Sequence, residues 1–135
     1  MMERGFHVAL LASLLLLLPR VASSQDGTGH TFSSGFRFVE MSGEELFSNV
    51  FQGCHMPDAT GAAGAGAYPP LAFNPNLQSS AYAIDLVVNG HRAMPPFGDM
   101  MNDAQVAAVV NYLRTHFGND YRDAVTPKDV TVARR

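Results

Sequence analysis

The chain has 135 residues, a single cysteine, nine basic and twelve acidic side chains, and a formal net charge of −3. This length allows one domain once a targeting segment is removed, and the mildly acidic charge balance argues against nucleic acid as a partner. The single cysteine, Cys54, excludes an internal disulfide, so its thiol is either free or bonded to something other than the chain.

The N-terminus has the pattern of a secretory signal peptide. Arg4 gives a positive start, residues 8–18 are almost entirely apolar, and small residues lead to a cleavage zone at Ser23 or Ser24. The apolar run is much shorter than the about 20 residues that span a bilayer. We therefore predict that residues 1–24 direct export and are removed, leaving no transmembrane anchor.

Residues 25–41 are mixed in character, and we expect them to form an extended N-terminal arm on the domain. A helix is predicted next, because Ser42 and Glu45 form a capping box. Apolar residues at positions 46, 47, 50 and 51 then share one helical face. The helix should end near Gly53 and Cys54.

Residues 56–79 are predicted to form a long loop. They contain four prolines and three glycines, a density that argues against any regular element. A loop of more than about 15 residues inside a compact domain is uncommon unless it is functional. Its side chains are mostly too small to form a core, so it needs something else to pack on.

A short helix is predicted over residues 80–89, ending at Gly90. The Ala-Met-Pro-Pro-Phe-Gly run at residues 93–98 follows as a rigid extended loop, because its two prolines restrict the backbone.

The last long helix is predicted to open at Asn102 or Asp103 and to stop at Gly118. Gln105 completes a capping box, and apolar residues at 106, 109, 110, 113 and 117 form a helical stripe. A short terminal helix can begin at Thr126. We find no convincing strand and no internal repeat, so the predicted class is all-α with long irregular loops.

Cys54 and His55 lie where the first helix gives way to the long loop. Cys-x-x-Cys-His is the attachment signature of haem c, in which two thiols bond to the porphyrin and the histidine binds iron. Here the first cysteine is replaced by Phe51. Taken alone, the Cys-His pair carries almost no signal and is better explained by a buried thiol beside a surface histidine.

Met94 lies in the rigid loop, directly before Pro95 and Pro96. Its thioether is a soft ligand suited to iron, although a methionine more often simply fills a core. His91, Met100 and Met101 are rival ligands close to the same loop.

Helix, Cys-His, a long Gly/Pro loop, Met-Pro and a final amphipathic helix together resemble a class I cytochrome c, over residues 43–118. The resemblance implies a cytochrome c domain at residues 42–118 and a tail at 119–135. It further implies that the first and last helices pack around one haem. The small and aromatic residues where these helices meet correspond to Gly43, Phe47, Val109 and Tyr112.

The resemblance implies that His55 is the proximal iron ligand and Met94 the distal one. Pro69 and Leu71 match the Pro-x-Leu segment whose proline carbonyl accepts the second N–H of the proximal histidine. Only Cys54 remains to form a thioether, so haem c is expected to be attached by a single bond.

Three further residues are expected to touch the cofactor. Phe51 is apolar and can pack against the porphyrin edge where the missing thioether would lie. Arg92 can pair with a haem propionate, although an arginine at such a position is more often a solvated surface residue. Phe97 lies in the loop that carries the distal methionine.

The amino-acid sequences of residues 53–58, 64–69 and 111–119 resemble those of a narrower group. This group consists of small bacterial cytochromes that accept electrons from periplasmic dehydrogenases of the flavin, quinone or molybdenum type. That resemblance implies an electron carrier of the periplasm, not an enzyme, which passes electrons to a downstream acceptor.

Three other functions stay open. The missing cysteine also suits a haem-free relic that serves as a structural or interaction subunit. A haem enzyme such as a peroxidase would need a vacant sixth iron position. A copper site can use Cys54, His55 and Met94, but copper sites of this kind usually lie in β-sandwiches.

Overall fold

The computed structural model describes residues 37–64 and 66–134. The predicted signal peptide and most of the predicted arm lie outside these residues. The chain divides into two units, residues 1–30 and 31–135, and all that follows concerns the second.

The first helical segment is built from three consecutive parts: α1 (Gly43–Leu46), a π-helix η1 (Phe47–Phe51) and α2 (Gln52–His55). The predicted capping box is confirmed, because the Glu45 amide donates to the Ser42 hydroxyl over 3.2 Å and Ser42 N donates to the Glu45 carboxylate. The segment ends at His55, one residue after Cys54. The wider π turn keeps both Phe47 and Phe51 buried.

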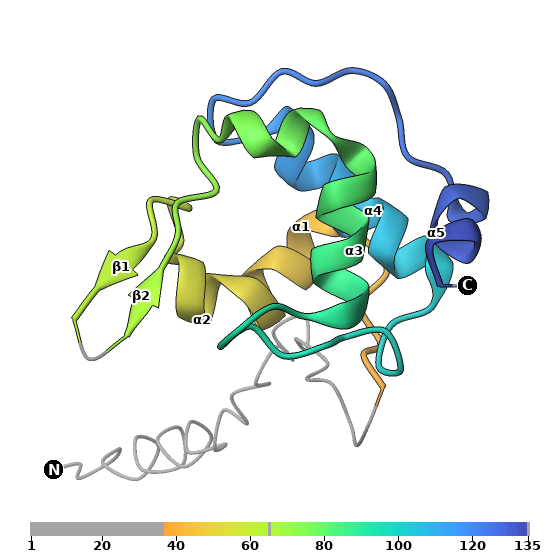
Figure 1. The fold of residues 1–135 in the computed structure, drawn as a ribbon, viewed down its shortest axis with the longest axis horizontal. Coiled ribbons are helices and arrows are strands. Elements are labelled where there is room, and N and C mark those ends of the chain that lie inside the picture. Colours follow the sequence, from red (N-terminus) through yellow and green to blue (C-terminus); the bar gives the residue numbers. More distant parts are fainter. Residues whose placement is uncertain (1–36, 65, 135) are drawn as a thin grey trace, which may run out of the picture. The chain divides into compact units, whose positions relative to one another are not determined.

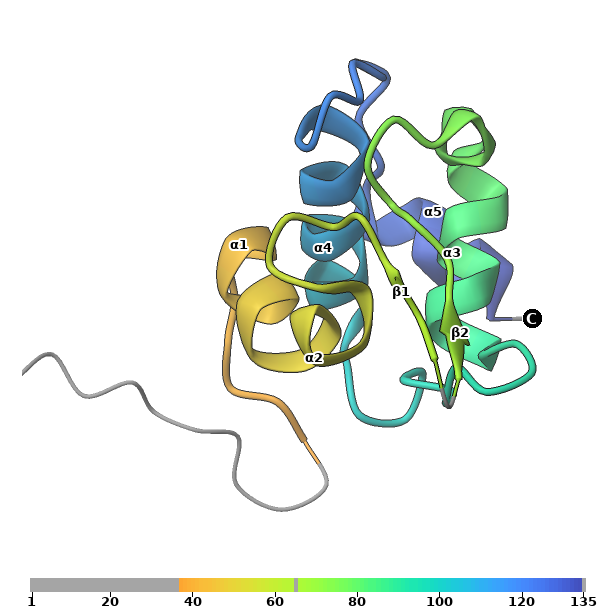
Figure 2. The ribbon, with the colours of Figure 1, turned by 90° about the vertical axis from the view of Figure 1, so that its left-hand side faces the viewer.

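This segment crosses α4 (Asp103–Thr115) at very close range (Figure 1). A Cβ atom placed on Gly43 would lie 2.3 Å from the Ala108 carbonyl oxygen and 2.5 Å from the Tyr112 Cβ. The Phe47 ring centroid is 5.9 Å from that of Tyr112. The predicted meeting of Gly43 and Phe47 with Tyr112 is therefore confirmed, and both views place α1 beside α4 (Figure 2).

The remaining predicted helices are present: α3 (Ser80–Asn89) and α5 (Pro127–Ala133), which pack on each other and on α4. Asn102 and Gln105 form the predicted capping box of α4. This helix ends at Thr115, before the expected Gly118, and Phe117 and Gly118 follow with φ of +56° and +80°.

The expectation that residues 56–79 hold no regular element, and the chain no strand, is wrong. Strands β1 (Ala62–Ala63) and β2 (Ala67–Tyr68) form a short antiparallel hairpin, and a 3-10 helix η2 (Pro75–Gln78) follows. The glycines that exclude a helix are also the residues that allow a tight hairpin. Two-residue strands are too short to give an alternating pattern.

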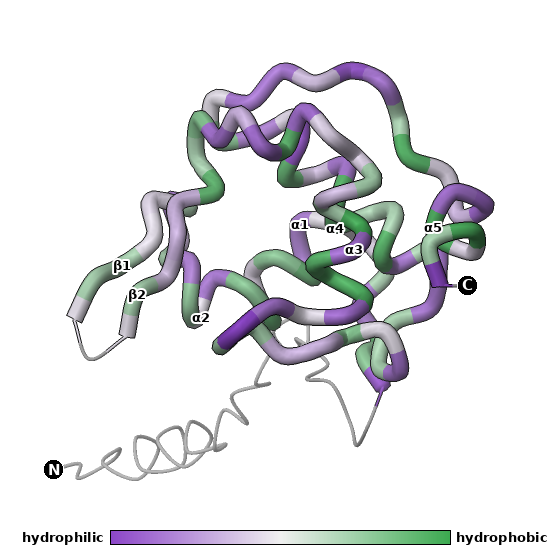
Figure 3. The backbone as a smooth tube through the Cα atoms, viewed as in Figure 1, coloured by the Kyte–Doolittle hydropathy of each residue, from purple (hydrophilic) through white to green (hydrophobic). Residues whose placement is uncertain are grey.

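The core lies where α1, η1, α3, α4 and α5 meet. Its fully buried side chains include Leu46, Phe47, Met101, Val106, Val109, Val110 and Val130. In Figure 3 the helices carry much of the strongly hydrophobic sequence, whereas the hairpin is pale. In the part of the chain that the structure describes, no helix is both long and apolar enough to cross a bilayer.

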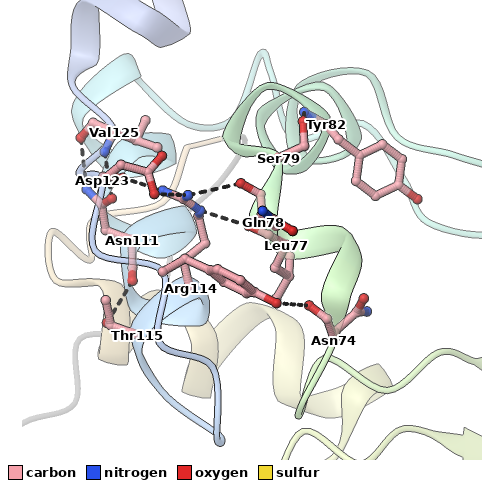
Figure 4. Close-up of polar contacts among 11 residues, drawn as sticks. Asn74, Leu77, Gln78, Ser79, Tyr82, Asn111, Arg114, Thr115, Asp123 and Val125 are labelled. Atoms are coloured by element: carbon pink, nitrogen blue, oxygen red, sulfur yellow. Dashed lines mark hydrogen bonds and ion pairs between the residues drawn. The ribbon is translucent and has the colours of Figure 1, made fainter.

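A buried arginine joins the far end of α4 to the segments beside it (Figure 4). Arg114 Nε donates to the Leu77 carbonyl over 2.9 Å and Nη2 to the Gln78 carbonyl over 3.2 Å. The guanidinium also donates to the Asp123 carbonyl and, over 2.6 Å, to the Asp123 carboxylate. One side chain thus connects α4, η2 and the segment that leads to α5.

Candidate cofactor site

His55 is the last residue of α2, and the residue is only 7% exposed. Its Nδ1 lies 2.9 Å from the Pro69 carbonyl oxygen, as the sequence predicts. A carbonyl oxygen only accepts, so Nδ1 donates, and in the neutral ring the lone pair is then on Nε2.

The second ring nitrogen of His55, Nε2, has no hydrogen-bond partner among the described residues. No fully buried side-chain nitrogen or oxygen of these residues lacks a partner, so Nε2 is at least partly accessible and is not fully enclosed by protein. The hydrogen bond to Pro69 fixes the orientation and tautomer of the ring and leaves a lone pair on Nε2. Histidines that bind metals are commonly held in this way, with the other ring N–H donated to a carbonyl group.

Gly61 fixes the backbone between His55 and Pro69. Its amide donates to the His55 carbonyl over 3.0 Å, and its φ is +71°. A Cβ here would lie 2.3 Å from the Tyr68 carbonyl oxygen and 2.8 Å from the Pro69 carbonyl carbon. Only a glycine allows β2 to come this close to the end of α2. The sequence marks Gly61 only as a residue that disfavours regular structure, and so it does not predict this role.

Leu71 is held in place from two directions. The Ala59 carbonyl accepts from the Leu71 amide over 2.8 Å and from the Ala72 amide over 2.9 Å. The Asn119 side chain donates to the Leu71 carbonyl over 2.9 Å and to the Leu113 carbonyl over 2.8 Å. The loop that carries Pro69 is thereby tied to the end of α4, by residues that sequence reasoning did not single out.

Cys54 is exposed and has no cysteine partner, whereas Phe51 is buried. The Phe51 ring centroid lies 5.1 Å from that of Phe97, and Phe97 lies 6.0 Å from Phe38. The structure thus brings together two of the predicted cofactor residues, Phe51 and Phe97. Phe38, which the sequence assigned only to the arm, completes this aromatic cluster.

Met94 is half-buried and packs against the core at the end of a tight turn. Its amide donates to the His91 carbonyl over 2.9 Å, and the His91 amide donates to the Met94 carbonyl over 3.0 Å. Gly90 has a φ of +70°, and a Cβ there would lie 2.5 Å from the Met94 carbonyl oxygen. Close backbone packing therefore restrains this loop, in addition to its prolines.

Arg92 lies at the tip of the same turn, with an exposed side chain and a φ of +52°. Among the carboxylates that the structure describes, it has no ion-pair partner. Its guanidinium is thus available to an anionic group. Of the rival ligands, Met101 is buried, Met100 is half-buried against the core, and His91 is exposed.

Comparison with known proteins identifies the family to which the chain belongs. Residues 39–113 match the model of the family described as cytochrome C oxidase, cbb3-type, subunit III. The match covers the first helical segment, the long loop, the Met94 turn and most of α4.

Curated relatives carry related names. The chain is 29% identical to the cytochrome c subunit of an alcohol dehydrogenase (quinone) from Komagataeibacter europaeus, over 92% of this chain and 30% of that subunit. It is 33% identical to the fructose dehydrogenase cytochrome subunit of Gluconobacter japonicus, over 57% of this chain and 19% of the relative. It is 32% identical to the gluconate 2-dehydrogenase cytochrome c subunit of Pantoea cypripedii, over 69% and 24%. The chain thus spans less than a third of the length of these relatives.

Proposed function

Because the chain belongs to the family of cytochrome C oxidase, cbb3-type, subunit III, we propose that it is a single-haem c-type cytochrome that transfers electrons and performs no substrate chemistry. The observation that carries this proposal is the Pro69 carbonyl 2.9 Å from His55 Nδ1. That bond leaves the other ring nitrogen free, one residue after an exposed cysteine.

The residues present fit haem c. Cys54 would hold it through one thioether, while His55 Nε2 and the Met94 sulfur would bind iron on its two sides. Arg92 would pair with a propionate. Phe51, Leu71 and Phe97 would supply apolar surface.

Haem held in this way would supply a one-electron Fe(II)/Fe(III) couple. Because His55 and Met94 would both bind the iron, no position would remain for a substrate or peroxide, which favours electron transfer over ligand activation. The peroxidase alternative needs such a site, and nothing in the described residues favours it over the carrier.

The redox partner that we propose is suggested by the relatives, which are named as cytochrome subunits of dehydrogenases. The cytochrome would accept electrons from a periplasmic dehydrogenase of the flavin, quinone or molybdenum type and pass them to a downstream acceptor. It would work in the periplasm after residues 1–24 are removed.

The attachment is tested by acid–acetone extraction followed by an alkaline pyridine haemochrome spectrum. We expect haem to stay with the protein and to absorb between the b and c types, as one thioether requires. In Cys54→Ser, haem should extract into the solvent. Haem that extracts from the wild-type protein contradicts covalent attachment, and a folded but colourless protein favours the haem-free interaction subunit.

The axial assignment is tested by Met94→Ala in the haem-loaded protein. Loss of the sulfur should open the sixth position, change the visible spectrum and lower the reduction potential, within the range of about 0.8 V over which axial ligands set haem potentials. Met100→Ala is the matched control, because it removes a neighbouring half-buried thioether. An unchanged spectrum and potential in Met94→Ala rule out this ligand.

A further inference from the structure

We propose that Arg134 and Asp103 form a clasp that keeps the Met94 loop closed, and that Arg134 is therefore a positioning residue for the distal iron ligand. The proposal rests on the proposed function. Arg134 follows α5 and lies beside the start of α4, where three of its nitrogen atoms have partners.

The guanidinium joins three separate groups. Nε contacts the Asp103 carboxylate at 2.6 Å, Nη1 donates to the Gly98 carbonyl over 2.5 Å, and Nη2 donates to the Met101 carbonyl over 2.7 Å. Gly98 and Met101 lie in the second half of the loop that begins at Met94. The clasp therefore ties the end of this loop to α4 and α5 together.

Asp103 is itself held from α5. Its second oxygen accepts from the Thr131 hydroxyl over 2.5 Å. The Thr131 hydroxyl first, and the Arg134 guanidinium next, lower the pKa of Asp103 against the effect of burial. The Arg134 and Asp103 side chains are only 26% and 29% exposed, so water weakens this pair less than a fully exposed one.

The middle of the loop, at Phe97 and Gly98, has separate restraints. The Phe97 amide donates to the Val87 carbonyl over 2.9 Å, and the Gly98 amide donates to the Val88 carbonyl over 3.1 Å. Loss of the clasp would leave these two bonds to α3 in place. We therefore expect more frequent local opening of residues 94–101, not unfolding of the domain.

The experiment compares wild-type, Arg134→Gln and Arg122→Gln in the full-length haem-loaded protein. Arg122 is the matched control, because it is 81% exposed and its one ion-pair partner among the described residues is the exposed Asp120. The readouts are hydrogen exchange of the peptide over residues 94–101, cyanide affinity of the ferric protein, and the absorption band of the sulfur–iron(III) bond.

In Arg134→Gln we expect exchange of this peptide to rise about tenfold, because even one charge-assisted hydrogen bond is worth about that factor. Cyanide affinity should rise about tenfold as well, since the open state takes the ligand. Asp103→Asn should give a smaller change, because the two Arg134 bonds to loop carbonyls remain. Arg122→Gln should change neither quantity.

Each other outcome has a defined meaning. If the wild-type protein shows the sulfur–iron band but Arg134→Gln leaves exchange and cyanide affinity unchanged, the clasp is wrong and the proposed function stands. If exchange rises equally in α3 and α4, Arg134 contributes general stability and the clasp is also wrong. If the wild-type protein has no such band, the axial assignment fails first and the clasp fails with it.

Discussion

At the scale of single residues, the candidate site depends on one glycine beside the histidine. Gly61 donates its amide to His55 and leaves no room for a side chain against β2 and Pro69. The position of the Pro69 carbonyl, and so the orientation of the His55 ring, depends on this close approach.

Gly61→Ala should therefore disturb the His55 ligand. The left-handed backbone alone costs about 1–2 kcal/mol for a residue with a Cβ, and the new methyl must push Pro69 away. We expect the free energy of unfolding to fall by at least this amount and the reduction potential of the haem-loaded protein to shift. Urea unfolding and potentiometry measure the two effects.

Gly64→Ala is the control for this variant. Gly64 lies in the same loop, but a Cβ there would have nothing within 4 Å. Equal losses of stability in the two variants, with an unchanged potential in Gly61→Ala, would show that the glycine matters for the loop and not for the histidine.

Sequence reasoning singles out the candidate ligands of this site more readily than the residues that hold them in place. His55, Pro69 and Met94 stand out through their resemblance to a known pattern. Ala59, with its φ of +59°, and Asn119 act through backbone geometry and contacts between distant segments. Nothing in the local sequence distinguishes such residues from ordinary loop residues.

At the scale of elements, the crossing of α1 and α4 leaves no room for a larger side chain at Gly43. The Gly43 Cα hydrogens face the Ala108 carbonyl and the Tyr112 side chain, with no space for a methyl group. Gly43→Ala should separate the two helices and lower the free energy of unfolding by about 1–3 kcal/mol, the usual cost of overpacking.

Gly53→Ala is the comparison that isolates packing from helix propensity. Gly53 lies in α2, and a Cβ there would meet nothing within 4 Å. Because alanine favours a helix by up to about 1 kcal/mol over glycine, this variant should be as stable as the wild-type protein or more so. Thermal unfolding of both variants measures the contrast, and a stable Gly43→Ala would contradict the tight crossing.

The elements differ in how far the sequence reveals them. Capping is local, so Ser42 with Glu45 and Asn102 with Gln105 mark helix starts correctly. The π-helix stays hidden, because the four-residue spacing of Phe47 and Phe51 also fits an α-helix. The hairpin stays hidden because it is defined by pairing across the loop and not by the sequence of either strand.

At the scale of the whole molecule, Arg114 is fully buried and binds the carbonyls of two adjacent residues of η2, which lie 37 and 36 positions earlier in the sequence. A buried guanidinium needs every donor satisfied and a counter-charge nearby. Asp123 provides that charge from the surface, where its side chain is 73% exposed. Arg114, by its hydrogen bond first, lowers the pKa of Asp123 below its ordinary value of 3.8.

The sign of the resulting pH dependence follows from that direction. A carboxyl group whose pKa is lower in the folded state stabilises the fold above its ordinary pKa, and the contribution is lost as the pH falls through the folded value. Asp123→Asn keeps an oxygen that accepts from Arg114 but removes the charge. It should be less stable than the wild-type protein at neutral pH, and the difference should close as the pH falls below 3.8.

Urea unfolding at stepped pH from neutral to strongly acidic, with Asp120→Asn as the control, measures this difference. Among the described residues Asp120 pairs with the exposed Arg122 and with no buried charge, so its variant should follow the wild-type curve more closely. Added salt should narrow the gap for Asp123→Asn, because the carboxylate is exposed to ions. A gap that stays constant at every pH would contradict the assignment of this stability difference to the charge of Asp123.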